Sequence, residues 1–248
     1  METSFTLTFD NQSTAEVLKI QAGQEISTAL STINLKKRSP VLVVIGGASQ
    51  ISQPDLVRLE RLFVEVLAPL AKELGLCVVD GGTDSGVMGL MGKARNQVKG
   101  TFPLIGVSPI GLVKFPHHSN SSSEAATLEP HHTHFLLVPG SKWGDESPWL
   151  AQIASVLAGE HPSVTVLING GAIALVDATE NVKFHRPLIV IAESGRLADE
   201  IATSLSHPEQ EVRQEIASLI AMGELRVFNL SDPLSKLREL LTEKLIIE

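Results

Sequence analysis

From residue 41 onward, short apolar runs of four or five residues alternate with longer segments, several of which carry apolar residues at helical spacing. Strands that alternate with helical segments are typical of βαβ units. Because most of these runs are apolar on both faces, they fit a parallel sheet that is covered on both sides. Seven strands are expected, at residues 41–45, 76–79, 104–107, 135–138, 164–168, 188–191 and 225–228.

The remaining segments complete an α/β fold. Helices are expected at residues 26–33, 55–74, 148–157, 208–222 and 233–245, and Pro69 should bend the second of them. Apolar and Thr side chains alternate over residues 5–9, a turn follows, and a second short strand predicts a hairpin. We therefore expect a hairpin and short helix in residues 1–38, appended to a Rossmann-like domain in residues 39–248. That domain should contain a mostly parallel sheet of about seven strands with helices on both faces.

The net charge and the cysteine content of the chain limit the kinds of partner and the cellular compartment that we expect. The formal net charge is −8 without a dense basic run, which argues against nucleic acid or an anionic membrane as the main partner. No apolar stretch approaches the ~18 residues of a membrane span, and no secretory leader pattern is present. Cys77 is the only cysteine and lies in an apolar run, as expected of a core residue in a reducing compartment. We expect a cytoplasmic location.

Small residues follow most of the predicted strands. In a parallel sheet these turns share one edge, and ligands bind open α/β sheets outside the carboxyl ends of the strands. Free backbone N–H groups and helix N-termini there favour a phosphate, even in an acidic protein. Glycine in tight βα turns is the alternative explanation, and neither the G-x-G-x-x-G pattern nor a P-loop is present. The turns contain Gly46, Gly47 and Ala48; Gly81, Gly82, Thr83, Ser85, Gly86 and Val87; Gly140 and Ser141; Gly170 and Gly171; and Ser194, Gly195 and Arg196.

These turns, taken in order with the His132-Thr133-His134-Phe135 stretch, resemble a known superfamily. Their order and spacing over residues 40–201 are similar to the SLOG domain, in particular its LSDAT branch, which forms the N-terminal region of TRPM cation channels. The resemblance implies a Rossmann-like sheet that binds a nucleotide-derived ligand as a sensor, with ADP-ribose or another NAD derivative expected. It places phosphates and ribose against the glycine pairs, Thr83, Ser85, Gly86, Ser194, Gly195 and Arg196. Ala48, Val87, His134, Gly140, Ser141 and Trp143 complete the expected binding residues.

SLOG also contains enzymes, which supply a second hypothesis. The LOG phosphoribohydrolases carry P-G-G-x-G-T-x-x-E, and residues 169–177 stand at the equivalent place with Asp177 where the glutamate would be. The proline, the third glycine and the threonine are absent, so the sequence favours binding over hydrolysis. If the protein is an N-glycosidase acting on a nucleoside monophosphate, Asp177 or Glu146 would be its acid/base. A structural subunit with a vestigial cleft is the third possibility.

Two further residue types leave alternatives open. His132 and His134 have the spacing for a shared zinc, but no cysteine is nearby, so no metal is expected, and one histidine should face the ligand while the other packs. Trp143 either stacks on an adenine or packs, Glu146 is a candidate partner for ribose hydroxyls, and Trp149 should anchor its helix. Self-association into a homo-oligomer is possible by analogy with enzymes of the superfamily.

Overall fold

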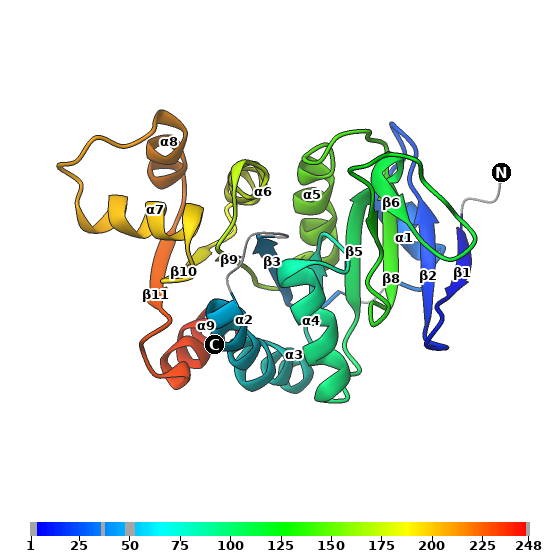
Figure 1. Ribbon diagram of the computed structural model, residues 1–248, viewed down its shortest axis with the longest axis horizontal. Coiled ribbons are helices and arrows are strands. Elements are labelled where there is room, and N and C mark those ends of the chain that lie inside the picture. The colour runs from blue at the N-terminus through cyan, green and yellow to red at the C-terminus, as the bar shows by residue number, and fades with distance from the viewer. Residues whose placement is uncertain (1–3, 36–37, 48–52, 247–248) are drawn as a thin grey trace.

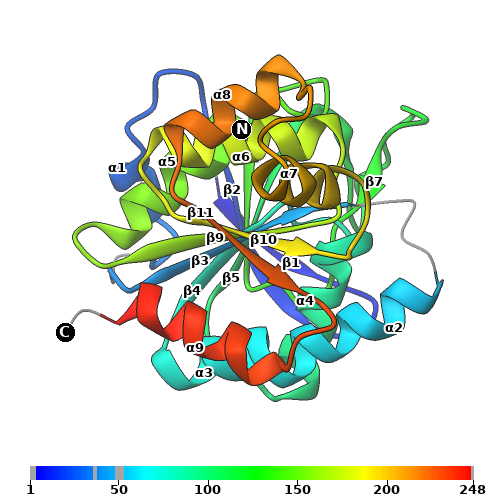
Figure 2. The ribbon, with the colours of Figure 1, turned by 90° about the vertical axis from the view of Figure 1, so that its left-hand side faces the viewer.

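A single nine-stranded sheet forms the centre of the protein in the computed structural model, which describes residues 4–35, 38–47 and 53–246. Helices cover both faces of the sheet (Figures 1 and 2). The spatial order is β1-β2-β8-β5-β4-β3-β9-β10-β11, and only β1 runs antiparallel to its neighbour. The strands are β1 (Ser4–Thr8), β2 (Thr14–Lys19), β3 (Val41–Gly46), β4 (Cys77–Asp80), β5 (Leu104–Pro109), β8 (His134–Val138), β9 (Ser163–Ile168), β10 (Leu188–Ala192) and β11 (Leu225–Asn229).

From β3 onward, the direction of the chain across the sheet reverses once. From β3 it proceeds through β4, β5 and β8 to one side, then returns to β9 on the other side of β3 and continues to β10 and β11. Strands β3 and β9 are therefore neighbours whose following loops diverge to opposite sides. This arrangement leaves a crevice at the carboxyl ends of the two strands, where open α/β sheets bind ligands.

The N-terminal hairpin continues the sheet. All seven expected strands are present, and β2 pairs in parallel with β8, with Val17 opposite Phe135, so the sheet has nine strands rather than about seven. Helix α1 (Ile26–Ser31) adds Ile26, Ala29 and Leu30 to the same core as the central strands. The hairpin is thus hydrogen-bonded to the larger unit, and a domain boundary at residues 38–39 stays a prediction.

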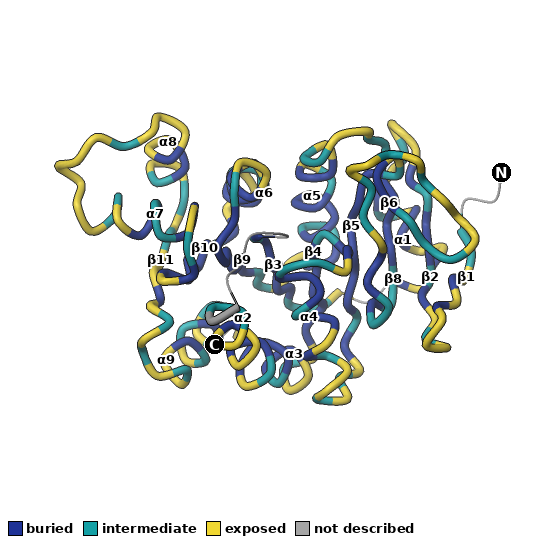
Figure 3. Tube along the Cα trace, viewed as in Figure 1, coloured by how far each residue is buried: buried dark blue, intermediate teal, exposed yellow. Residues whose placement is uncertain are grey.

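Alternating side chains of the buried strands divide the core into two layers. Val41 and Val43 of β3 face one layer, and Leu42 and Val44 face the other. Figure 3 shows this burial along the central strands, with the exposed residues in the outer loops and helix surfaces. The first layer contains α1, α5 (Ser147–Ala158), α6 (Ala172–Lys183), α7 (Arg196–Ser206) and α8 (Gln214–Met222); the second contains α2 (Gln53–Leu62), α3 (Ala68–Leu74), α4 (Gly86–Gln97) and α9 (Leu234–Leu245).

Two predicted helices differ in detail. The segment 55–74 is helical throughout, but a π-helical turn, η1 (Phe63–Leu67), joins α2 to α3. The Ala68 amide donates to the Phe63 carbonyl five residues earlier, and this wider turn precedes Pro69, whose ring crowds the carbonyl four residues before it. Helix α8 begins at Gln214 rather than near residue 208, because residues 206–211 are exposed and have no apolar face to pack.

The segment between β5 and β8 contains two short paired strands, β6 (Val113–Lys114) and β7 (Ala126–Thr127). Helices α4, α6 and α7 have no counterpart among the expected helices. Across the part of the chain that the structure describes, none of the helices has both the length and the apolar character needed to cross a bilayer.

Candidate functional site

A cavity of about 380 Å³ lies at the carboxyl ends of β3, β4 and β9, at the point where the strand order reverses. Its walls come from both helical layers, with α4 on one side and α5 and α6 on the other. The expected carboxyl-edge crevice is therefore a real cavity. Of the predicted site residues, those that line it are Gly46, Gly47, Gly81, Thr83, Ser85, Trp143, Gly171 and Arg196.

Other predicted residues lie behind this wall and support it. The buried Ser194 hydroxyl accepts a hydrogen bond from the Asn169 amide at 2.7 Å, and the Asn169 side chain donates back to the Ser194 carbonyl at 2.7 Å. The Asn169 carbonyl oxygen Oδ1 in turn accepts from the Gly170 amide at 2.8 Å. A Cβ at Gly195 would lie 2.8 Å from Asn169 Nδ2. Ser194, Gly195 and Gly170 therefore shape the turn that presents Gly171.

The remaining predicted residues are not brought into the cavity wall. Gly86 and Val87 open α4, and the Val87 amide donates to the Gly47 carbonyl at 3.1 Å. Gly140 accepts from the Gly111 amide at 3.0 Å, and the Ser141 amide donates to Asp145 at 2.9 Å, so both act within their own loop. Ala48 lies outside the described residues.

His134 is at the opposite edge of the sheet. It is the first residue of β8, and its Nδ1 lies 2.8 Å from the Thr133 hydroxyl. Because parallel strands place their first residues at the edge away from the carboxyl ends, His134 cannot face this cavity. His132 is also buried away from it, so neither histidine is placed toward a ligand in the cavity. In the described part of the chain, no three His, Cys, Asp or Glu side chains are grouped to hold a metal ion.

The glycines of the site differ in whether the packing of the fold requires them. A Cβ at Gly46 would lie 2.0 Å from the Ile168 carbonyl oxygen, and one at Gly82 would lie 2.7 Å from the Gly106 Cα. Close approach of neighbouring strands explains both of these glycines. A Cβ at Gly81 would meet only the Met88 side chain, at 3.7 Å. The packing of the fold therefore leaves room for a side chain at residue 81, unlike at residues 46 and 82.

One wall of the cavity is electropositive. Gly171 is the N-cap of α6 and Ser85 that of α4, and neither helix has a side-chain hydrogen bond at its cap. The hydroxyls of Thr83 and Ser85 lie 2.9 Å apart beside the start of α4. Uncapped helix N-termini present free N–H groups and a partial positive charge. Both helices therefore begin at the cavity with donors available to an anion.

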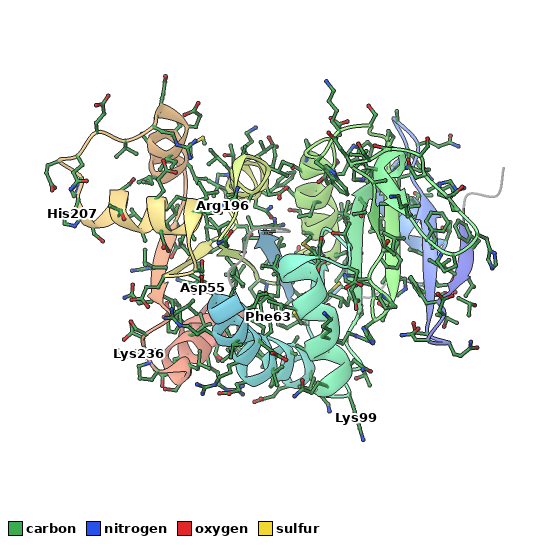
Figure 4. All side chains as sticks on the ribbon, in the orientation of Figure 1. Asp55, Phe63, Lys99, Arg196, His207 and Lys236 are labelled. Carbon is green, nitrogen blue, oxygen red and sulfur yellow. The ribbon has the colours of Figure 1, made fainter. Side chains whose placement is uncertain are left out.

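Arg196 adds a full positive charge to this wall. It is the first residue of α7 (Figure 4), and its guanidinium lies against Gly171, where a Cβ would be 2.5 Å from Nη2. Among the residues that the structure describes, no hydrogen bond or ion pair joins Arg196 to an acceptor. A cation at a helix N-terminus is electrostatically unfavourable. An anion bound between them would offset both the charge of the Arg196 guanidinium and the partial positive charge at the N-terminus of α6.

Two carboxyl groups, one from the residue before α5 and one from α6 itself, also line the cavity. Glu146, 6% exposed, accepts from the Gly144 amide at 2.7 Å, and Asp177 accepts from the Ser147 hydroxyl at 2.5 Å. Burial raises the pKa of Asp177 to about 7, opposed in part by the Ser147 hydrogen bond and assisted by the charge of Glu146. Burial also raises the pKa of Glu146. Asp177, which stands at the position of the LOG glutamate, lies on the cavity wall.

The two tryptophans have different places. Trp143 lines the cavity, and its Nε1 donates to the Glu124 carbonyl at 3.1 Å, which ties the loop before α5 to the long 115–127 segment. Trp149 packs on the core of the α1–α5 layer, as expected for an anchor of its helix. Sequence reasoning missed Met88, Glu124, Ala126 and Ile173 in the wall. Met88 and Ile173 lie within two helical turns after a glycine pair, and this position in the sequence could have identified them. Glu124 and Ala126 lie in a segment without apolar periodicity, where no pattern in the sequence marks them.

Known proteins resemble this chain in sequence over about 70% of its length. The chain is 28% identical over 220 residues to the transient receptor potential cation channel subfamily M member-like 2 of Nematostella vectensis, which covers 73% of this chain and 14% of the channel. It is 25% identical over 207 residues to subfamily M member 2 of Mus musculus, covering 69% of this chain and 14% of the channel. The chain therefore matches about one seventh of the length of these relatives.

A solved structure shares the fold. The X-ray structure of the structural-genomics target TM1055 superposes with a TM-score of 0.55 at 16% identity, covering 82% of this chain and 99% of that one. Residues 39–238 match the sequence model of a family described as SLOG in TRPM, prokaryote. That match spans most of the chain and contains every described residue of the cavity wall. The chain belongs to the prokaryotic LSDAT family, the SLOG proteins related to the TRPM channels.

Proposed function

We propose that this protein is a sensor that binds a nucleotide-derived ligand, ADP-ribose or another NAD derivative, in the cavity at the carboxyl edge of the sheet. The observation that carries the proposal is the guanidinium of Arg196, unpaired among the residues that the structure describes, beside the uncapped N-terminus of α6. Phosphate is the biological anion that suits both groups, because a guanidinium binds it bidentately and helix N-termini bind it through backbone N–H groups.

The rest of the cavity suits the remainder of a nucleotide. The cavity volume of about 380 Å³ falls in the range of small-molecule sites. Glu146 and Asp177 supply acceptors for ribose hydroxyls, and Trp143 offers an aromatic surface for a base. A cytoplasmic location and the absence of a nucleic-acid partner remain predictions from the sequence, as does the possible homo-oligomer.

Isothermal titration calorimetry with ADP-ribose, NAD and AMP tests the proposal directly. We expect saturable binding of at least one of the three, with affinity that weakens as sulfate or phosphate is added. Mass spectrometry of small molecules that copurify with the native protein identifies the ligand. Absence of binding for all three nucleotides, with no copurifying phosphorylated compound, would leave the cavity vestigial and contradict the proposal.

A second function is favoured by one observation, the carboxyl group of Asp177 in the cavity. A group with a pKa of about 7 is suited to donate or accept a proton at neutral pH. Under this alternative, the N-glycosidic bond of a nucleoside monophosphate breaks as water adds to C1′ of the ribose, and Asp177 donates its proton to the leaving base. The proton lost by the water restores the carboxyl group, and free base and ribose 5-phosphate are released. Chromatography for free base after long incubation with AMP separates the two functions, and Asp177→Asn should abolish any release that is seen.

A further inference from the structure

Behind the cavity, three buried charged side chains form a continuous network. Asp80, His132 and Glu129 are each at most 1% exposed. His132 Nε2 lies 2.8 Å from Asp80 Oδ1, and His132 Nδ1 lies 2.8 Å from Glu129 Oε2. With both carboxyl groups ionised, their oxygens can only accept hydrogen bonds, so both ring nitrogens of His132 carry a proton. His132 is therefore an imidazolium between two carboxylates.

This network is hydrogen-bonded to the backbone of the loop that follows β4. Asp80 Oδ1 also accepts from the Gly82 amide at 2.7 Å, and the Glu129 amide donates to the Gly82 carbonyl at 3.0 Å. Both polar backbone groups of Gly82 are thus bound by the two carboxylate residues that His132 joins. Gly81 and Thr83, on either side of Gly82, line the cavity.

Helix α4 leaves room for the network. A Cβ at Gly92 would lie 2.0 Å from Glu129 Oε2, so only glycine at this position of α4 lets the carboxylate approach. Other charged groups also face Glu129. Its Oε1 lies 2.5 Å from His131 Nδ1, and the guanidinium of Arg95, which donates to the His131 carbonyl at 3.2 Å, attracts it.

The negative charge of Asp80 is offset by fewer neighbouring groups than that of Glu129. Its Oδ2 is buried and, within the described residues, has no hydrogen-bond partner. His132 is the cation in contact with it. Charges interact strongly in a weakly polarisable interior, so an uncompensated carboxylate directly before residues 81–83 would repel an anion bound at this loop.

We propose that His132 is a positioning residue of the ligand site: its imidazolium fixes residues 81–83 through Asp80 and Glu129, and it neutralises Asp80 beneath the bound phosphate. The effect on ligand affinity rests on the function proposed above. The charge state of His132 and its hold on the loop do not depend on any ligand, and they are tested separately.

The first test uses the protein without ligand. Nitrogen-15 spectra of histidine-labelled protein, with His132→Gln to assign the signal, should show His132 with both nitrogens protonated at pH 7.5. Hydrogen exchange at the Gly82 amide should accelerate in His132→Gln. His134→Gln is the matched control, since His134 is in the same stretch but contacts neither carboxylate, and it should leave the exchange unchanged. A neutral His132 at pH 7.5, or unaltered Gly82 exchange in His132→Gln, overturns the proposal.

The second test uses ADP-ribose and AMP as probes. His132→Gln should weaken binding at least about tenfold, the loss expected when a charge-assisted contact is removed. The double variant Asp80→Asn/His132→Gln should recover most of the affinity, because it removes the uncompensated charge, and His134→Gln should bind normally. Circular dichroism at the titration temperature checks the fold of each variant. If His132→Gln binds as tightly as the wild type, or if the double variant recovers no affinity, the claim that His132 neutralises Asp80 is contradicted.

The two proposals fail in different ways. If the wild-type protein binds neither nucleotide, the proposed function is wrong for these ligands, while the ligand-free spectra and exchange rates still decide whether His132 holds the loop. If the wild type binds and His132→Gln binds equally well, the function stands and the role of His132 is rejected.

Discussion

The guanidinium of Arg196 occupies the space that a side chain at residue 171 would need, because a Cβ on Gly171 would lie 2.5 Å from Nη2. The two residues come from the loops after β10 and β9, which are neighbouring strands. Glycine at 171 therefore lets a full positive charge lie at the start of α6. Such an arrangement is unfavourable for the helix alone and becomes favourable when an anion binds there.

Replacing Arg196 tests this relationship. Arg196→Ala should weaken binding of ADP-ribose or AMP by ~1.5–3 kcal/mol, the contribution of a charge-assisted hydrogen bond. Arg196→Lys should bind with intermediate affinity, because it keeps the charge but loses the bidentate geometry. Calorimetric titration measures both. Arg61→Ala, which removes an exposed arginine on α2 paired with Glu65, is the control and should bind normally. Unchanged affinity in Arg196→Ala would remove this residue from the site.

Replacing two glycines of the cavity with alanine should have different effects: one replacement should lower stability, and the other should lower nucleotide affinity. Gly46→Ala brings a methyl group to 2.0 Å from a backbone carbonyl and should destabilise the fold by at least ~2 kcal/mol. Gly81→Ala has room in the folded protein and should leave the urea denaturation midpoint nearly unchanged while reducing nucleotide affinity. If Gly81→Ala binds as tightly as the wild type, the ligand does not approach the backbone at residue 81.

Asp177 should make stability depend on pH in the acidic range. Burial raises its pKa from about 3.8 to about 7, so between these values the folded protein holds a proton that the unfolded chain has released. The free energy of unfolding should therefore fall as pH rises from 4 to 7, by ~4 kcal/mol in total. Asp177→Asn escapes this loss. Urea denaturation should show the variant gaining stability over the wild type between pH 4 and pH 8, and a constant difference across that range would contradict the assignment.

His132 should produce a second pH dependence at higher pH. Burial alone lowers its pKa, but Asp80 and Glu129 outweigh that effect and raise the pKa to about 9. A group whose pKa is raised on folding stabilises the protein fully below its unfolded value of about 6.5. This contribution is lost as pH rises through 9. Thermal denaturation of the wild type should show that decline, and His132→Gln, already less stable at pH 6, should change little over the same range.

Local sequence patterns were sufficient to predict the nine strands of the central sheet, but not the short β6 and β7. The run at 41–45 is apolar at every position, which requires burial on both faces whatever its neighbours are, and β3 is found there. The helix at 55–74 was predicted from one apolar face, but its π-helical turn before Pro69 was not. The hairpin was also predicted from alternation, whereas its pairing with β8 was not, because residues 14–19 carry no information about which distant strand they join.

For the site, sequence by itself determined the composition of the turns and therefore the kind of ligand they suit: small residues, exposed N–H groups and one arginine. Only the tertiary structure decided which of these turns meet. It separated Gly81, free to face a ligand, from Gly46, which the adjacent strand requires, and it placed His134 at the far edge and Asp177 on the wall. The physical reason is that residue type fixes what a group can bind, while strand order and packing fix which groups share one cavity.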